Sequence, residues 1–277
     1  MVKVWVVGPV ALDWVLHVSV LPRSGEFVQG SGFLKRPGGA GSNVAIALAS
    51  AGCDVSIVGY VGNDDSGNAM VKSLTDAGVK TDFLRRLDVP TSEVIILIDS
   101  TGERTMLGIH QDQMNVIGLP VNQVSRDDIV YYAAWHGQFA RDLERLECTV
   151  VAVPPQGGEH VASSHFLVGS ESEFSASGFS FPGSLTGLAP VTTGVLVTRG
   201  SAGVSVYGPT YYYEEPAMKV KVVDTTGAGD AFAAGMLLEL SRGRELRSAV
   251  KTGVRWGGLT AASHGSIPPP LPSFASD

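Results

Sequence analysis

The chain has 277 residues, 44% of them hydrophobic and 17% charged, and its formal net charge is −7. A chain of this length and apolar content can bury a sizeable core, which excludes an intrinsically disordered protein and a disulfide-dense miniature domain. The acidic balance, without any run of Lys and Arg, argues against a nucleic-acid-binding protein. Size alone favours one large α/β domain with a small appendage.

The sequence predicts neither a membrane protein nor a secreted one. No apolar run approaches the ~20 residues that span a bilayer, and the first residues are typical of a strand rather than of a signal peptide. Cys53 and Cys148 lack CxxC spacing, and we expect both to be reduced and buried. We therefore expect a cytoplasmic protein without membrane association.

Taken in chain order, the elements of the first half alternate between apolar β-branched runs and periodic segments closed by glycine. They are a strand over 2–7, an antiparallel ribbon over 12–36, a helix over 43–51, a strand over 56–61, a helix over 66–77 and a hairpin formed by 94–98 and 105–109. The second half predicts short strands over 129–134, 149–153, 166–168 and 195–198, strands around turns over 204–223, and helices over 228–240 and 245–262.

Strands that alternate with helices predict an α/β fold with a three-layer, doubly wound and mostly parallel sheet. The ribbon and the hairpin do not fit this alternation. We expect the segments at about 12–36 and 91–110 to form a small separate β-sheet, within a single domain that spans 1–277.

The strongest local motif is DTTGAGDAF, residues 224–232, which follows a strand-like run and opens a helix. The N–H groups of Gly227, Ala228 and Gly229 would point outward at the helix start, where the helix dipole adds positive potential. Such a turn is suited to an anion such as a transferring phosphoryl group. Asp230 lies beside it, where a carboxylate can take the proton of an attacking hydroxyl.

This motif resembles the C-terminal signature of the PfkB, or ribokinase-like, carbohydrate kinases. PGGAGSNVAIALASAG, residues 37–52, resembles the N-terminal signature of the same family. Other family landmarks recur in the same order, namely GPVALD at 8–13, GERT at 102–105 and TRGSAG at 198–203. The resemblance spans about residues 2–268 and implies an ATP-dependent kinase that phosphorylates a hydroxyl, as a rule a hydroxymethyl, of a small sugar-like molecule.

The resemblance also implies roles for individual residues. It makes Asp230 the base and Gly227, Ala228 and Gly229 the anion hole. Residues that would hold the acceptor are Asp13, Gly38, Gly39 and Asn43. Residues that would border the ATP phosphates are Thr198, Gly200, Gly203 and Ser170. The small sheet would act as a lid, and in this family such lids often pair two subunits, so a homodimer through the lid is expected.

The implied cofactors are ATP and Mg²⁺, with K⁺ left open. The family pattern Asn-x-x-Glu, which organises Mg²⁺ and its waters, matches Ser170 to Glu173, so Glu173 fits while Ser170 replaces the expected Asn. A hydroxyl can still hold a water, which would keep Mg²⁺ handling in weaker form. Asp224 and Thr226, with the 262–266 stretch, would form the monovalent-cation loop.

The acceptor is left open as a sugar or a nucleoside, because Trp135 and His136 stand where a ribokinase would present an acidic contact. A catalytically impaired sugar-binding homologue also remains open, since Ser170 departs from the pattern and residues 150–197 leave little room for helix. An NAD-dependent Rossmann enzyme lacks support, because GPVALD follows the first strand in place of GxGxxG. A P-loop NTPase lacks its GxxxxGK[ST] motif.

Overall fold

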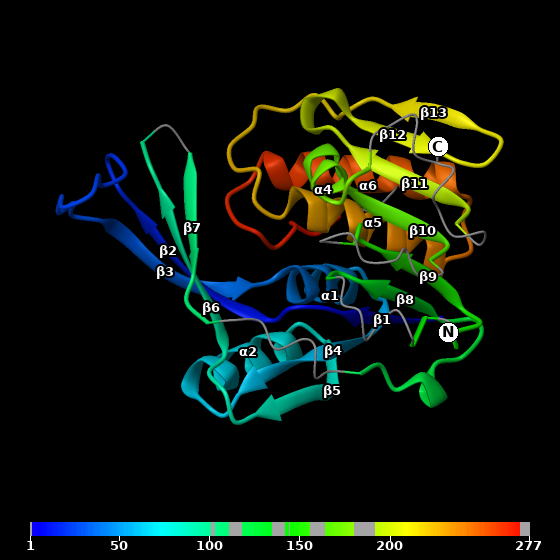
Figure 1. Cartoon of the computed structure of the whole chain (residues 1–277), viewed down its shortest axis with the longest axis horizontal. Helices are drawn as coiled ribbons and strands as arrows, with labels where there is room; N and C mark the ends of the chain where they lie inside the picture. Colours follow the sequence, from blue (N-terminus) through cyan, green and yellow to red (C-terminus); the bar gives the residue numbers. More distant parts are fainter. Residues whose placement is uncertain are drawn as a thin grey trace.

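The computed structural model of the chain describes residues 2–100, 103–110, 118–134, 142–143, 145–155, 164–179 and 192–271. Within these ranges a large sheet forms the centre of the molecule (Figure 1). Its strands are β1 (Lys3–Val7), β4 (Asp54–Gly62), β5 (Lys80–Leu87), β8 (Ile129–Tyr132), β9 (Thr149–Ala152), β10 (Phe166–Ser170), β11 (Gly194–Thr198), β12 (Val204–Tyr207) and β13 (Tyr212–Glu215). They lie in the order β13-β12-β11-β10-β9-β8-β1-β4-β5.

The large sheet is parallel from β5 to β11, and β12 and β13 extend it as antiparallel strands. Its central strands are apolar on both faces because both faces are covered. In β1, Val4 and Val6 pack into one core cluster while Trp5 and Val7 pack into another on the opposite face. This double burial confirms the prediction of a doubly wound, mostly parallel sheet.

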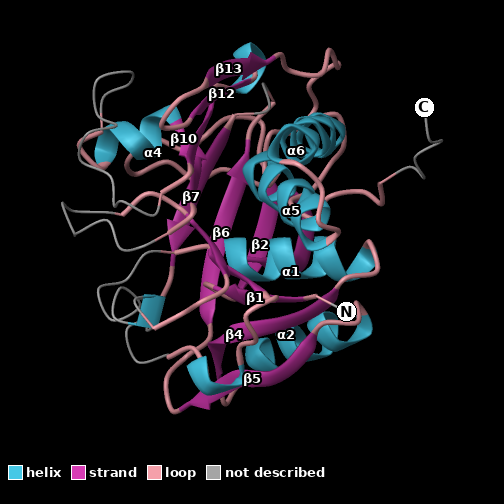
Figure 2. Ribbon diagram, turned by 90° about the vertical axis from the view of Figure 1, so that its right-hand side faces the viewer, coloured by secondary structure: helices cyan, strands magenta, loops and turns pink. Residues whose placement is uncertain are grey.

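One face of the sheet carries a layer of helices, and α4 lies on the other face (Figure 2). The helices are α1 (Ala40–Ser50), α2 (Asp65–Asp76), α4 (Glu171–Ala176), α5 (Ala228–Ser241) and α6 (Leu246–Ala261), with 3₁₀ turns η2 (Val121–Gln123) and η4 (Gly200–Ala202). None of the helices in the described ranges combines the length and the apolar character needed to cross a bilayer.

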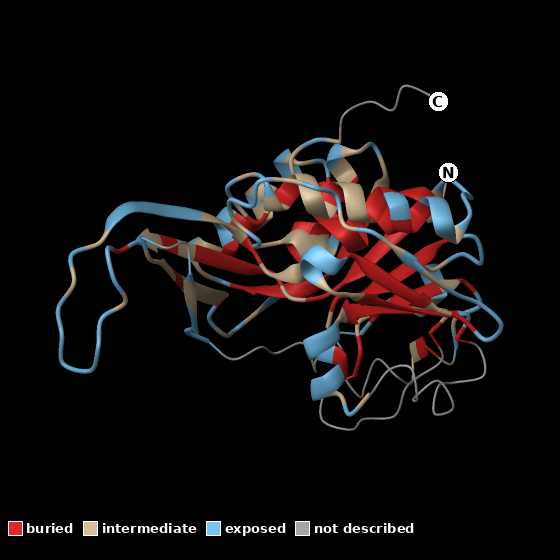
Figure 3. Ribbon diagram, turned by 90° about the horizontal axis from the view of Figure 1, so that it is seen from above, coloured by how far each residue is buried: buried red, intermediate tan, exposed pale blue. Residues whose placement is uncertain are grey.

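A second sheet projects from this body, at the left in Figures 1 and 3, and carries most of the exposed strand residues. Its strands are β2 (Ala11–His17), β3 (Ser31–Gly38), β6 (Ser92–Ile98) and β7 (Arg104–Gly108), in the order β3-β2-β6-β7. β2 pairs antiparallel with β3 and parallel with β6, and β7 returns antiparallel along β6. The small sheet thus arises from the two segments that the sequence assigns to it.

Several sequence predictions of single elements differ from the structure. β5 is not predicted, since the sequence of this edge strand, KTDFLRRL, lacks regular alternation of polar and apolar residues and carries three Arg and Lys side chains. The six-residue α4 is not predicted either. α1 begins three residues earlier than expected, at Ala40, so Asn43 lies inside the helix and the N-cap is Gly39. Residues 216–223, the last part of the 204–223 stretch expected to contain strands, contain none.

Candidate active site

The turn that opens α5 has the geometry of an anion site. Gly227 is the N-cap and has a φ of 72°, a left-handed conformation that favours glycine. A Cβ at this position would also collide with the Ser266 carbonyl oxygen. The Ala228 N–H donates to the Thr225 carbonyl at 3.2 Å. Within the described residues no acceptor faces the N–H groups of Gly227, Gly229 or Asp230, so these three donors are free for a ligand.

The hydrogen bonds of the turn bear on the anion hole that the sequence predicts. The sequence assigns the three donors to Gly227, Ala228 and Gly229, but the Ala228 N–H closes the turn on itself. The Asp230 N–H is available in its place, and only the turn geometry could have revealed this.

Asp230 stands in the first turn of α5 and is held by α1. Asn43 Nδ2 donates to Asp230 Oδ2 at 2.8 Å. The pKa of Asp230 is raised to about 7, chiefly by burial, while the Asn43 hydrogen bond opposes the rise and the charges of Glu173 and Asp13 add to it. A carboxyl group with a pKa near neutrality is suited to act as a general base at neutral pH.

Asp13 approaches the glycines of the other signature. Both of its carboxylate oxygens lie so close to Gly38 that a Cβ there would collide with them. Gly39 has a φ of 85°, and a Cβ on it would meet the Pro9 carbonyl oxygen at 2.6 Å. The contacts with Asp13 and Pro9 therefore require glycine at both positions.

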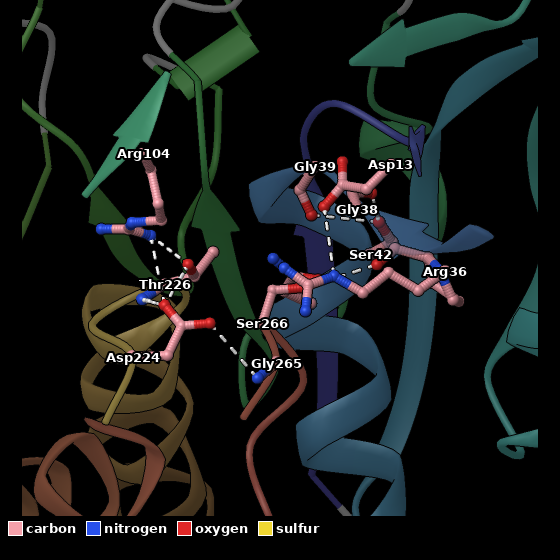
Figure 4. A network of polar contacts seen from close by, with 12 residues as sticks. Asp13, Arg36, Gly38, Gly39, Ser42, Arg104, Asp224, Thr226, Gly265 and Ser266 are labelled. Atoms are coloured by element: carbon pink, nitrogen blue, oxygen red, sulfur yellow. Dashed lines mark hydrogen bonds and ion pairs between the residues drawn. The ribbon is translucent and has the colours of Figure 1, made fainter. Parts of the chain in front are cut away.

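Arg36 is a partner of Asp13 that the sequence interpretation overlooked. Its Nε lies 3.8 Å from Asp13 Oδ2, and both side chains are largely buried (Figure 4). Burial raises the pKa of Asp13 to about 6, and Arg36 partly opposes the rise. Asp13 and Arg36 are directly opposite in the β2–β3 ladder and so share one face of the small sheet, a register that the sequence alone does not give.

A cavity of about 660 Å³ connects the anion turn with the carboxyl ends of β10 and β11. This volume lies within the usual range for small-ligand sites. Predicted site residues that line it are Ser170, Glu173, Thr198, Gly200, Gly203, Ala228, Gly229 and Asp230. Apolar residues that line it include Met218, Val220, Val222, Val254 and Ala261. One end of the cavity therefore offers polar groups and backbone amides, and the rest offers apolar walls.

Ser170 and Glu173 are locked together at the start of α4. The Ser170 side chain accepts from the Glu173 N–H, while Glu173 Oε2 accepts from the Ser170 N–H and hydroxyl, both at 2.7 Å. This capping box fixes the direction of the Glu173 carboxylate along the cavity wall. The Ser in place of the expected Asn therefore serves to begin the helix.

Asp224 and Thr226 lie just before the anion turn. Asp224 Oδ1 accepts from the Thr226 N–H at 2.8 Å and from its hydroxyl at 2.5 Å. Arg104 of β7 reaches across from the small sheet, donating to Thr225 Oγ1 at 2.8 Å and to Thr226 Oγ1 and lying 3.5 Å from Asp224 Oδ1 (Figure 4). The sequence interpretation gave Arg104 no role, although it belongs to the GERT landmark.

The structure thus brings two groups of predicted residues together at Asp230. Asp230 lines the same cavity as the first group. The second group, the glycine-rich signature, contacts Asp230 through the hydrogen bond from Asn43. Trp135 and His136, which bear on the acceptor, lie outside the described residues.

Comparison with known proteins finds similar sequences and structures over nearly the whole chain. A family model described as pfkB family carbohydrate kinase matches residues 1–140 and 156–273. The ribokinase of Bacillus subtilis (strain 168) is 28% identical over 280 residues, covering 95% of this chain and 94% of the relative. The ATP-dependent ribose-1-phosphate kinase of Halopiger xanaduensis (strain DSM 18323 / JCM 14033 / SH-6) is 30% identical over 284 residues, covering 96% and 94%. The crystal structure of a ribokinase from Thermotoga maritima matches with a TM-score of 0.86 and 25% identity, covering 96% of this chain and 95% of that one.

Proposed function

The chain belongs to the pfkB family of carbohydrate kinases, and from the geometry of its site we propose that it transfers the γ-phosphate of ATP to a hydroxymethyl group with Asp230 as the base. Sugar or nucleoside kinase activity is the activity of the family; the roles of single residues are our proposal. The observation that carries it is one cavity that places a half-buried carboxylate of raised pKa beside free backbone amides.

In the proposed step, Asp230 takes the proton of the acceptor hydroxyl as its oxygen attacks the γ-phosphorus. The new P–O bond forms while the bond to the β-phosphate oxygen breaks, and ADP leaves. The N–H groups of Gly227, Gly229 and Asp230 would face the charge on the transferring group. The hydrogen bond from Asn43 would orient the Asp230 carboxylate toward the acceptor hydroxyl.

The nucleotide would occupy the cavity between Thr198 and the anion turn. Its apolar walls suit a base, and Gly200 and Gly203 let the backbone come close to phosphates, since both have positive φ. For Mg²⁺ the donor set fits, because this ion keeps waters and needs one or two carboxylates besides the phosphates. Glu173 would hold it through water, and when bound it would neutralise phosphate charge.

The acceptor would lie under the small sheet, which we propose acts as a lid. Asp13 accepts hydrogen bonds from hydroxyls, and Asn43 and the backbone of Gly38 and Gly39 offer further polar groups. A closed lid excludes water, which would otherwise compete as acceptor. Since ATP is the phosphate donor, we expect the protein to act in the cytoplasm.

The test is ADP release with ATP, Mg²⁺ and a panel of ribose, ribose 1-phosphate, fructose and nucleosides. We expect one class of acceptor to be turned over and the phosphorylated product to appear by mass spectrometry. Sugar binding without turnover of any acceptor would instead indicate a catalytically impaired homologue. The intact Asp230 and its free amide neighbours favour the kinase.

A further inference from the structure

Arg104 is a residue of the small sheet whose side chain, within the described part of the chain, makes its recorded hydrogen bonds and ion pair with the loop before the anion turn. Its guanidinium touches the hydroxyls of Thr225 and Thr226 and the carboxylate of Asp224. The two segments are about 120 residues apart in sequence and belong to different parts of the fold (Figures 1 and 4). The face of β7 that carries Arg104 is the face of the lid that bears Asp13, by the register of β7, β6 and β2.

The groups around Asp224 are hydrogen-bond donors. Oδ1 accepts the N–H and the hydroxyl of Thr226, and Oδ2 faces the Gly265 N–H at 3.4 Å. The Thr226 hydroxyl donates to Asp224 and accepts from Arg104, so its donor and one of its two lone pairs are used. Burial by itself would raise the pKa of Asp224, but the Thr226 and Gly265 hydrogen bonds and the Arg104 charge together hold it below the ordinary value.

A monovalent cation needs oxygen lone pairs directed at a common point, and it is repelled by N–H groups. The recorded hydrogen bonds direct the side-chain oxygens of Asp224 and Thr226 at N–H and O–H donors. The positive charge beside these oxygens is that of Arg104. These two residues therefore do not fit the monovalent cation that the family resemblance implies. A guanidinium keeps its charge at every physiological pH and can donate to two hydroxyls at once.

We propose that Arg104 supplies, from the lid, the positive charge beside the anion turn in place of a monovalent cation. The inference rests on the proposed function, because the turn matters only if it binds a phosphoryl group. Arg104 is then a positioning residue, which acts on the amides of 227–230 through Asp224 and Thr226. Arg104 belongs to the small sheet, so these contacts join the proposed lid directly to the loop before the anion turn.

If the contact between Arg104 and Asp224 were a solvated surface ion pair, it would contribute little to stability or positioning. Arg104 and Asp224 are 24% and 10% exposed, however, and the ion pair is accompanied by two hydrogen bonds from the same guanidinium. Ordering a long Arg side chain costs conformational entropy. Arg104 is ordered in this way against the loop that precedes the proposed base.

The first experiment measures initial rates of the whole protein in KCl and in choline chloride at equal ionic strength. We expect the wild-type rates to agree within about twofold, and Arg104→Ala to lower kcat by about 10- to 100-fold, the scale of a displaced catalytic group. Arg104→Lys should recover part of the loss because it restores the charge. Arg23→Gln is the matched control, since Arg23 lies in the exposed lid loop between β2 and β3 and should leave kcat unchanged.

The second experiment measures thermal unfolding of the nucleotide-free protein in the same two salts. A resident cation raises Tm by mass action, so we expect no K⁺-dependent rise in the wild type. A wild-type rate that needs K⁺, a K⁺-dependent rise in wild-type Tm, or a kcat of Arg104→Ala near that of wild type would each overturn the inference. Should Arg104→Ala not fold, Arg104→Gln replaces it. Absence of all kinase activity would instead contradict the proposed function, and the unfolding experiment would still report on the cation.

Discussion

At the scale of single residues, Asp230 carries the largest consequence. Asp230→Asn keeps the volume of the side chain but cannot accept a proton, so we expect kcat to fall by about 10²-fold or more. ATP binding, followed by fluorescence or calorimetry, should change little because the backbone amides remain. Turnover close to that of the wild type would remove Asp230 from the mechanism.

The same substitution should also change stability, and measuring this change shows whether the variant is folded. The folded-state pKa of Asp230, about 7, lies above the ordinary value, so ionisation is disfavoured in the folded protein. The stability that the protonated Asp230 carboxyl group contributes to the fold is therefore fully present below the unfolded-state pKa and is lost as the pH rises through about 7. Asp230→Asn should accordingly unfold at an equal or higher temperature than wild type at pH 8, as measured by circular dichroism.

A pH profile tests the contact between Asn43 and Asp230. Activity should rise with pH through about 7, because only the ionised carboxylate can act as a base. Asn43→Ala removes the hydrogen bond that favours the ionised form, so the rising limb of kcat should move to higher pH. Ser50→Ala, at the far end of the same helix, is the control. A limb that stays in place in Asn43→Ala would show that the contact does not tune the base.

At the scale of elements, α5 and α6 pack closely through glycines. A Cβ on Gly235 would lie 2.8 Å from the Gly253 Cα and 2.9 Å from the Thr252 carbonyl oxygen. We therefore expect Gly235→Ala to destabilise the protein by about 1–3 kcal/mol through overpacking, which urea unfolding would measure. At Gly108 a Cβ meets no atom within 4 Å and φ is not positive, so Gly108→Ala should stay within about 0.5 kcal/mol of wild type. Equal stability of both variants would contradict the close packing.

The elements also show what sequence reasoning can and cannot reach. The buried strands and the glycine-closed helices are predicted because burial on both faces, or on one stripe, leaves a periodic pattern. β5 escapes because an edge strand is half solvated and carries charge. Asp230 and the glycine turn are local in sequence and are found. Arg36 and Arg104 are not, because their partners lie across a strand ladder or 120 residues away, and no local pattern marks such pairs.

At the scale of the whole molecule, the site lies where the fold places ligands in other open α/β sheets. The carboxyl ends of β10 and β11 supply Ser170 and Thr198, which are directly opposite in the parallel ladder. The lid reaches the same edge from the other side through Arg104 and the Asp13 face. The small sheet is also anchored to the main body away from this site, since Leu12 of β2 belongs to the main core and Tyr60 of β4 is hydrogen-bonded to Ser92 of β6.

The distal part of the lid is apolar and exposed, which bears on the expected homodimer. Leu34 and Met106 are 52% and 61% exposed, and by register they share the face that carries Asp13. Phe33 and Leu107, 58% and 52% exposed, lie by the same register on the opposite face of the sheet. Apolar side chains gathered on a projecting sheet are typical of an association surface.

We therefore expect light scattering to give twice the 29.0 kDa mass of the chain at micromolar concentration. The double variant Leu34→Glu/Met106→Glu should give a monomer if the Asp13 face pairs, because it would bury four like charges against one another across a two-fold axis. Phe33→Glu/Leu107→Glu is the matched variant for the second pair of side chains. The variant that dissociates identifies the pairing surface, whereas a monomeric wild type, or two unaffected double variants, would contradict a dimer through the lid.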